Sequence, residues 1–224
     1  LNEFDPFFNY RATEYIVDNG LSQYFEWWDE KTWYVSPELK ERWEVVELGG
    51  EGRDVSSTSQ VMLHVTTAFT YQIFGINLSL YDYTILFPAI IGSLTVVVIF
   101  GLVRLFGGTQ AGLIASLLFA VSLPIILRGT IGWFKSEPLG LFFAFLALYL
   151  FVSGIKFNKG KISLIKLIFA GFFLSLGLSA WGGILFFLIP IVLFYFSLPF
   201  FKNKDNFIMW AAPAFSISLI LFSL

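Results

Sequence analysis

Hydrophobic and polar positions divide the chain into a polar first third and a hydrophobic remainder. Five long hydrophobic runs without a charged residue are 83–103, 105–127, 138–155, 167–201 and 206–224. A helix needs about 20 residues to cross the hydrocarbon core of a bilayer. The run that begins at Leu167 is too long for one helix, and Trp181-Gly182-Gly183 offers a turn in it. The pattern therefore predicts about six membrane spans, near residues 83–105, 109–127, 138–156, 162–180, 183–201 and 206–224.

The polar part is expected to form a large loop on one side of the membrane. Residues 1–81 (the outer segment) carry most of the acidic residues, and residues 57–74 have the periodicity of an amphipathic helix. Residues 82–224 are expected to form the membrane bundle. Cationic residues gather in alternate loops, which the positive-inside rule places in the cytoplasm: Arg104, Lys156, Lys159, Lys161, Lys166, Lys202 and Lys204. The outer segment and residues 128–137 (the second outer loop) are then both extracytoplasmic, which predicts a multi-pass protein of the cell membrane.

Composition supports this assignment. The chain is 57% hydrophobic and 13% charged, whereas soluble domains carry roughly 25% charged residues. The predicted fold class is therefore all-α, a polytopic membrane helical bundle with a large outer loop. The chain contains no Cys, which excludes disulfides and thiolate sites. It has no initiator Met, and it is expected to be an internal fragment of a longer protein.

Acidic side chains provide the candidate chemistry. Glu3 and Asp5 lie two residues apart in the outer segment, and Glu137 ends the second outer loop. Carboxylate oxygens are hard ligands that suit Mg²⁺ or Mn²⁺. Two simpler interpretations stay open, because paired acids in a loop are commonly just solvated, and a carboxylate at a helix N-terminus serves the helix dipole.

Several stretches of aromatic and charged residues follow one another in a characteristic order. They are Glu3-Phe4-Asp5-Pro6 and residues 8–13, 25–34, 52–53, 78–82, 88–89 and 128–137. In these stretches the chain resembles the catalytic subunit of oligosaccharyltransferase, specifically its archaeal AglB type. The resemblance runs along the whole chain and implies a fragment from the N-terminal membrane half of a GT-C-like glycosyltransferase.

The resemblance implies an activity, substrates and a cofactor. Such an enzyme transfers an oligosaccharide from a polyisoprenyl (dolichyl) phosphate or pyrophosphate carrier to Asn in an Asn-x-Ser/Thr sequon. An amide nitrogen is a poor nucleophile because its lone pair is delocalised, and carboxylates that hold its N–H groups can position it. A bound Mn²⁺ or Mg²⁺ would stabilise the leaving phosphate. Asp5 matches the family's metal-binding aspartate beside the acceptor amide, and Glu3 matches its catalytic partner.

The second outer loop departs from the family pattern. The family has an acid, any residue, and then an acid or His, whereas this chain has Lys135-Ser136-Glu137. Glu137 matches the second acid and is expected to bind the metal together with Asp5. An ammonium has only donors, so Lys135 is expected either to point away from the ion or to pair with the carrier phosphate. Arg128 matches a family arginine and is expected to contact the carrier phosphate or support the site, with loop anchoring as the alternative.

Two other functional classes fit part of the pattern. A protein mannosyltransferase also uses a lipid-phosphate sugar and an outer-loop acid, but the aromatic stretch 25–34 argues against it. A transporter places ionisable groups near the middle of its spans, and the expected spans have none there. The sole histidine, His64, is expected to pack or to lie at the membrane interface. No basic stripe suggests nucleic acid as a partner.

Overall fold

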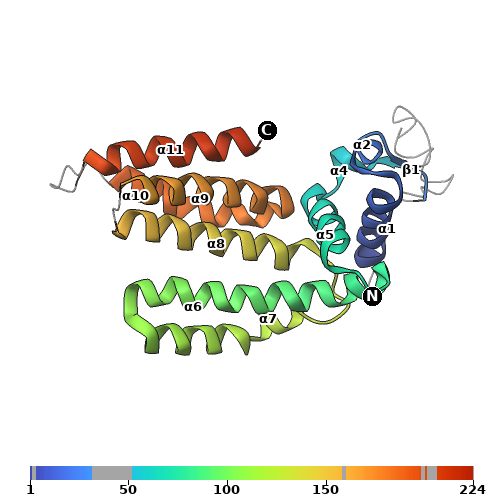
Figure 1. Cartoon of the computed structure of the whole chain (residues 1–224), viewed down its shortest axis with the longest axis horizontal. Helices are drawn as coiled ribbons and strands as arrows, with labels where there is room; N and C mark the ends of the chain where they lie inside the picture. The colour runs from blue at the N-terminus through green and yellow to red at the C-terminus, as the bar shows by residue number, and fades with distance from the viewer. Residues whose placement is uncertain (2–3, 32–51, 158–159, 198–199, 201–205, 224) are drawn as a thin grey trace, which may run out of the picture.

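The computed structural model describes residues 1, 4–31, 52–157, 160–197, 200 and 206–223, and the described chain is mostly helical, which confirms the all-α class (Figure 1). Glu3 lies outside the described residues, as do Lys159, Lys202 and Lys204. The outer segment contains α1 (Phe4–Asn19), α2 (Leu21–Tyr24), β1 (Trp28–Asp29), β2 (Arg53–Asp54), α4 (Val55–Thr58) and α5 (Val61–Phe74). The remaining helices are α6 (Leu80–Ala120), α7 (Leu123–Arg128), α8 (Ser136–Phe157), α9 (Lys161–Ala180), η2 (Gly182–Ile184), α10 (Leu185–Ser197) and α11 (Asn206–Ser223).

The long helices α6, α8, α9 and α11 lie side by side, and the outer segment sits at one end of them (Figure 1). The second outer loop leads into α8 at this same end, because α8 begins at Ser136. Lys156 and Lys161 lie at the other end, where α8 finishes and α9 begins. The bundle thus separates the acidic segment from these lysines, as the sequence predicts.

Helix α6 is a hairpin of two helical arms. Gly108 interrupts its helical geometry with φ +78°, a left-handed conformation that costs glycine little because it has no Cβ. The chain reverses direction at the end of the bundle opposite the outer segment (Figure 1). This reversal is close to the expected break between the spans 83–105 and 109–127. The second arm stops at Ala120, and α7 follows it after Ser122.

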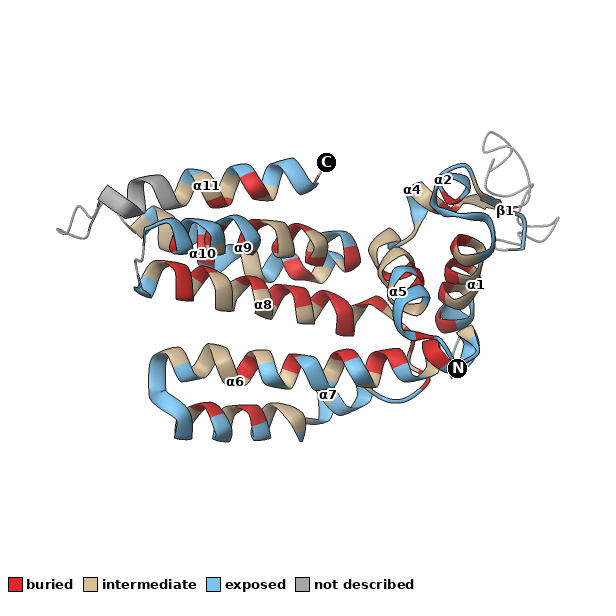
Figure 2. Cartoon of the chain, in the orientation of Figure 1, coloured by how far each residue is buried: buried red, intermediate tan, exposed pale blue. Residues whose placement is uncertain are grey.

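Three of the described helices are long and apolar enough to cross a membrane: α6, α8 and α9. The bounds of α8 and α9 agree with the expected spans to within two residues at each end. Helices α10 and α11 contain shorter apolar stretches, so the count of six spans stays a prediction. Exposed residues are frequent on the second arm of α6 and on α7 (Figure 2), and Leu117 and Leu123 are 64% and 67% exposed. Such a surface suits contact with lipid.

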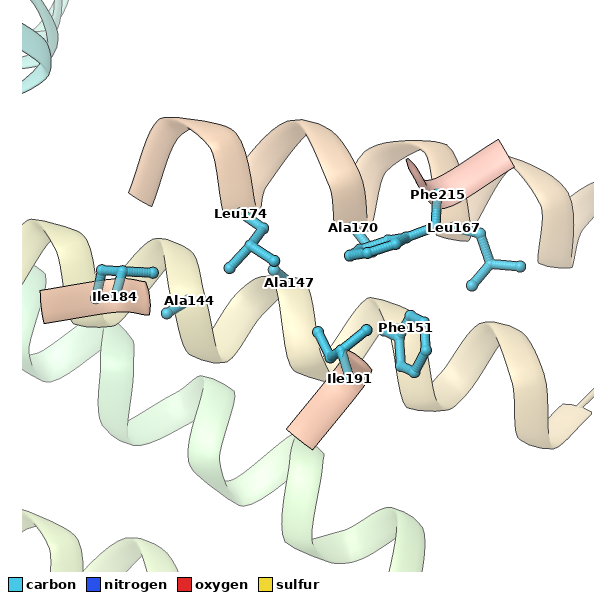
Figure 3. Close-up of a cluster of buried hydrophobic side chains, with 9 residues drawn as sticks. All are labelled: Ala144, Ala147, Phe151, Leu167, Ala170, Leu174, Ile184, Ile191 and Phe215. Atoms are coloured by element: carbon cyan, nitrogen blue, oxygen red, sulfur yellow. The ribbon is translucent and has the colours of Figure 1, made fainter. Parts of the chain in front are cut away.

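The bundle core lies between α8, α9, α10 and α11. Its buried side chains, drawn in Figure 3, are Ala144, Ala147, Phe151, Leu167, Ala170, Leu174, Ile184, Ile191 and Phe215. Small residues let two of the helices approach closely: a Cβ built on Gly171 would lie 2.6 Å from the carbonyl oxygen of Phe215. The Ser218 hydroxyl donates to the Ile168 carbonyl at 2.7 Å across the same contact. Small residues and hydroxyls commonly mediate helix contacts within membranes.

A second cluster (the junction cluster) joins the outer segment to the bundle. It contains Leu63 from α5, Tyr83 and Phe87 from α6, Phe134 from the second outer loop, and Leu139 from α8, all of them buried. The second outer loop is also tied to α6 by a hydrogen bond from the Gly132 N–H to the Ile85 carbonyl at 2.9 Å. Gly132 has φ +84°, which favours glycine in this turn. These contacts hold the loop against the outer segment.

Candidate active site

The structure brings the outer segment and the second outer loop together through one ion pair. Asp5 stands in the first turn of α1, where a carboxylate is also favoured by the helix dipole. Its Oδ2 lies 3.1 Å from Nζ of Lys135. The Asp5 side chain is 73% exposed, whereas that of Lys135 is only 14% exposed. Lys135 thus reaches across to this carboxylate instead of pointing away from it, and its pairing with the carrier phosphate stays a prediction.

Lys135 is oriented by its neighbours in the loop. Its ammonium nitrogen lies over the Trp133 ring, 4.4 Å from the centroid, a contact that attracts a cation to the ring face. Its backbone N–H donates to the Trp133 carbonyl at 2.8 Å. Phe134 between them is fully buried in the junction cluster. The buried phenylalanine fixes the backbone, and the tryptophan supports the lysine side chain.

Glu137 stands in the first turn of α8 and carries both a paired and an unpaired oxygen. Its Oε1 accepts a hydrogen bond from Arg128 Nη1 at 2.7 Å. Its Oε2 is buried and has no hydrogen-bond partner in the described chain. Arg128 also lies over Trp133, 5.2 Å from the ring centroid. Loop anchoring is thus one role of Arg128, and Glu137 keeps one oxygen available to a further donor.

Both carboxylates face the same pocket. This pocket has a volume of about 280 Å³, and its lining includes Asp5, Arg53, Lys135, Glu137 and Trp181. The residues come from α1, β2, the second outer loop, the start of α8 and the end of α9. Of the sequence-predicted site residues, Asp5, Lys135 and Glu137 line the pocket and Arg128 bonds to one of them. Glu3 lies outside the described residues.

A buried chain of hydrogen bonds runs behind the pocket. The Asn9 side-chain amide donates from Nδ2 to the Phe134 carbonyl at 2.9 Å. Asn9 Oδ1 lies 3.0 Å from His64 Nε2, and His64 Nδ1 lies 2.7 Å from the Tyr24 hydroxyl. Ser59 ends the chain, with its Oγ 3.1 Å from the Tyr24 hydroxyl. The chain connects α2, α5 and α1 to the backbone next to Lys135.

The carbonyl of Phe134 determines the polarity of this chain. Because a carbonyl only accepts, Asn9 must present its NH₂ to Phe134 and its Oδ1 to His64. His64 Nε2 then carries the proton, and Nδ1 of the neutral ring accepts from the Tyr24 hydroxyl. Burial, with a smaller contribution from the charge of Arg53, lowers the pKa of His64 from 6.5 to about 3. The hydrogen bonds thus accommodate the neutral ring, which is the form that burial favours.

The roles of His64 and Arg53 were hardly predictable from the sequence. His64 is fully buried, so of the two expected roles the packed one is right, yet its two ring nitrogens make directional bonds that no periodicity predicts. Arg53 lines the pocket with its guanidinium 3.7 Å from the centroid of the Phe8 ring. Burial lowers the pKa of Arg53, and its Nε is a buried donor without a partner in the described residues. Only its place in the motif 52–53 pointed to it.

The described side chains around this pocket do not suit a divalent cation. The two carboxylates, Asp5 and Glu137, are accompanied by three cationic groups, Arg53, Lys135 and Arg128. A hard divalent ion favours several oxygen ligands, and the described residues contain no cluster of three or more His, Cys, Asp or Glu side chains able to hold one. The predicted Mn²⁺ or Mg²⁺ at Asp5 and Glu137 stays a prediction, and no step below depends on it.

Comparison with known proteins agrees with the pattern of motifs. Residues 1–46 and 50–224 match the family model described as oligosaccharyl transferase STT3, N-terminal. The match includes the outer segment, the second outer loop and all the described helices of the bundle.

Curated relatives come from several eukaryotes. A dolichyl-diphosphooligosaccharide–protein glycosyltransferase subunit STT3B of Oryza sativa is 30% identical over 189 residues, which cover 83% of this chain and 24% of the relative. The STT3 subunit of Saccharomyces cerevisiae is 28% identical over 200 residues, 87% of this chain and 25% of the relative. The STT3 subunit of Dictyostelium discoideum is 27% identical over 203 residues, 88% of this chain and 26% of the relative. The chain thus spans about a quarter of the length of these relatives.

Proposed function

Because this chain belongs to the STT3 family of oligosaccharyltransferase catalytic subunits, we propose that the protein containing it performs protein N-glycosylation. In this reaction an oligosaccharide passes from a dolichyl-type phosphate or pyrophosphate carrier to Asn of an Asn-x-Ser/Thr sequon on an acceptor polypeptide. The names of its relatives, which are dolichyl-diphosphooligosaccharide–protein glycosyltransferase subunits, support this donor class. The archaeal type is part of the proposal, since it is expected from the motifs while these relatives are eukaryotic.

The observation that carries the proposal is the meeting of two carboxylates from separate segments on one pocket. Asp5 and Glu137 both line it, and Oε2 of Glu137 is a buried acceptor without a partner among the described residues. The side-chain amide of an acceptor Asn has two N–H donors. Carboxylates that accept them hold the nitrogen in place and reduce its delocalisation, and positioning of this kind supplies much of the rate in group transfer.

The transfer step has a simple balance. The amide nitrogen of the acceptor attacks the anomeric carbon of the glycan with inversion, and the bond from that carbon to the carrier phosphate oxygen breaks. The leaving phosphate takes the electron pair of the broken bond, and the proton lost by the nitrogen passes to one of the two carboxylates and then to water. Cationic groups near the pocket, Arg53 and Lys135 within it and Arg128 beside it, are suited to the phosphate.

The proposed setting is the extracytoplasmic face of the cell membrane. The outer segment sits at one end of the bundle (Figure 1), and the pocket is lined by α1 and by the start of α8 at that end. Lys156 and Lys161 lie where α8 finishes and α9 begins. A carrier with a polyisoprenyl tail needs a lipid surface for the tail, and the exposed apolar side chains of α6 and α7 offer one (Figure 2). Family membership removes the support for a transporter, and it favours Asn over the hydroxyl acceptor of a mannosyltransferase.

The direct test is transfer by the full-length protein. Purified protein in detergent or nanodiscs is incubated with a dolichyl-linked oligosaccharide and a peptide that contains an Asn-x-Thr sequon. Glycosylation of the Asn, detected by mass spectrometry, supports the proposal. A matched peptide with Gln in place of Asn should remain unmodified, and modification of its Thr instead would favour the mannosyltransferase alternative.

A further inference from the structure

The charges around the pocket point to a cation that belongs to the chain itself. Lys135 Nζ lies 3.1 Å from Asp5 Oδ2, on a pocket that Glu137 also lines. We propose that the ammonium of Lys135 is the resident cation between the outer segment and the second outer loop. We propose that it supports the leaving phosphate without a divalent metal. The inference rests on the proposed function for its substrate, but the identity of the cation can be measured independently of transfer.

Lys135 is held as a defined part of the site. Its side chain is only 14% exposed, and its ammonium contacts the carboxylate of Asp5 and the face of the Trp133 ring. An ammonium is strongly hydrated in water, so burial to this degree requires contacts that replace the lost water. A carboxylate and an aromatic face both favour the charged form. The loop backbone beneath it is fixed by Phe134, whose carbonyl accepts from Asn9.

This lysine disfavours a divalent ion at Asp5. Its ammonium already neutralises the carboxylate through Oδ2, and Mg²⁺ demands oxygen ligands at about 2.0–2.1 Å in nearly octahedral geometry. An ammonium offers only donors and cannot join such a set. The ion would also be repelled by Lys135 itself and by Arg53 on the same pocket. With Lys135 in place, the pocket therefore selects an anion, which fits the phosphate of the donor.

The chemical role follows from the geometry. As the bond between the glycan and the phosphate breaks, negative charge grows on the phosphate oxygens. An ammonium has three N–H donors, so during the reaction one of them donates to such an oxygen while the contact with Asp5 is kept. Lys135 stays protonated throughout, so no proton or electron is added to the balance of the step. A charged donor placed in advance at a developing anion commonly contributes about 10²–10³-fold in rate.

The decisive experiment measures Mn²⁺ binding to the full-length protein by electron paramagnetic resonance, with no glycan donor present. Wild type should bind no Mn²⁺ that depends on Asp5, so wild type and Asp5→Asn should give the same titration. Lys135→Asp should gain one site, and adding Asp5→Asn to that variant should abolish it. Lys161→Asp, which adds a carboxylate at the exposed start of α9, is the control and should gain no such site.

Transfer assays give the second readout. Wild-type transfer should be unchanged, to within about twofold, by EDTA, whereas Lys135→Ala should reduce it by about 10²-fold or more. Lys135→Arg keeps the cation and should retain more activity than Lys135→Ala. An Mn²⁺ site in wild type that Asp5→Asn removes, or transfer abolished by EDTA, would overturn the inference. Absence of wild-type transfer under all conditions would instead refute the proposed function, while the Mn²⁺ titration would still decide which cation the pocket holds.

Discussion

The interior of the bundle and its junction with the outer segment are held by different kinds of contact. Between α9 and α11, Gly171 allows the backbone of one helix to approach that of the other, and aromatic and aliphatic side chains fill the rest (Figure 3). At the junction, Asn9, His64 and Tyr24 add a chain of buried hydrogen bonds. Apolar packing is non-directional, whereas a hydrogen bond fixes both a distance and an angle. A site assembled from two separate segments benefits from the second kind.

The largest effect is expected at the carboxylates of the junction. Asp5→Asn and Glu137→Gln should each lower transfer by the full-length protein by about 10²–10⁴-fold, because each removes an acceptor for the amide N–H groups. The measurement is the initial rate of peptide glycosylation. Asp18→Asn, a change at an exposed acid at the other end of α1, is the matched control and should be nearly neutral. Normal rates in both variants would reduce Asp5 and Glu137 to structural acids.

A large effect on stability is expected inside the bundle. Gly171→Ala would place a Cβ 2.6 Å from the Phe215 carbonyl oxygen and 2.9 Å from the Leu219 nitrogen. Backbone cannot yield as a side chain can, so the helices must separate, at a cost of about 1–3 kcal/mol. Thermal unfolding in detergent measures the loss. Gly182→Ala, whose Cβ would meet no atom within 4 Å, should leave stability unchanged, and equal effects of the two variants would contradict the close approach of α9 and α11.

The junction should depend on pH through His64. Its folded-state pKa of about 3 lies below the ordinary value of 6.5, so the unfolded chain binds more protons between these values. Stability should therefore be fully present above pH 6.5 and decline as the pH falls toward 3. His64→Gln keeps a donor for Asn9 and does not titrate, so it should remove this part of the slope while costing about 1 kcal/mol at pH 7.

Unfolding of wild type and His64→Gln at pH 7 and pH 5 is the relevant comparison. The free energy of unfolding should fall more steeply for wild type, and the difference isolates His64 from other histidines of the full-length protein. Parallel slopes would mean that His64 is not held neutral in the folded state.

The smallest effect is expected for the directional bond within the bundle. Ser218→Ala removes the hydroxyl that donates to the Ile168 carbonyl. That carbonyl lies inside α9 and keeps its helical hydrogen bond, so the loss should be about 0.6 kcal/mol, as is common for such bonds between membrane helices. The same unfolding assay measures it. If Ser218→Ala lowered the free energy of unfolding by more than His64→Gln does at pH 7, directional hydrogen bonds would matter more inside the bundle than at the junction.

The sequence predicted the elements better than the contacts between them. The expected spans 138–156 and 162–180 agree with α8 and α9 to within two residues at each end, because the length of a membrane span is set by the bilayer. The expected break between the spans 83–105 and 109–127 coincides with the reversal within α6 at Gly108. Hydropathy does not determine which side chains of a loop meet which helix. The contact between Asn9 and Phe134 joins residues 125 positions apart, and no local pattern encodes it.

In the candidate site, too, the sequence predicted which residues gather but not how one of them, Lys135, is oriented. The family resemblance singled out Asp5, Glu3, Glu137, Arg128 and Lys135. Glu3 lies outside the described residues, and the structure gathers the other four at the pocket or beside it. The orientation of Lys135 was expected from the chemistry of a metal site, in which a second cation is repelled. In the structure the lysine contacts Asp5 instead, because its ammonium packs on the Trp133 ring and the buried Phe134 holds the loop backbone. Metal binding by Asp5 and Glu137, which the resemblance implies, is the alternative that the Mn²⁺ titration of wild type and Asp5→Asn decides.

The most direct test is whether the outer segment and the second outer loop meet through Asp5 and Lys135. The described chain offers a clean background, since the sequence contains no Cys. In a full-length protein freed of other reactive cysteines, Asp5→Cys combined with Lys135→Cys should be linked in high yield by a short bis-thiol reagent. Asp5→Cys combined with Lys161→Cys, at the far end of the bundle, should remain unlinked. Linkage of the second pair, or failure of the first while both thiols react with a monofunctional reagent, would contradict a site shared by the two segments.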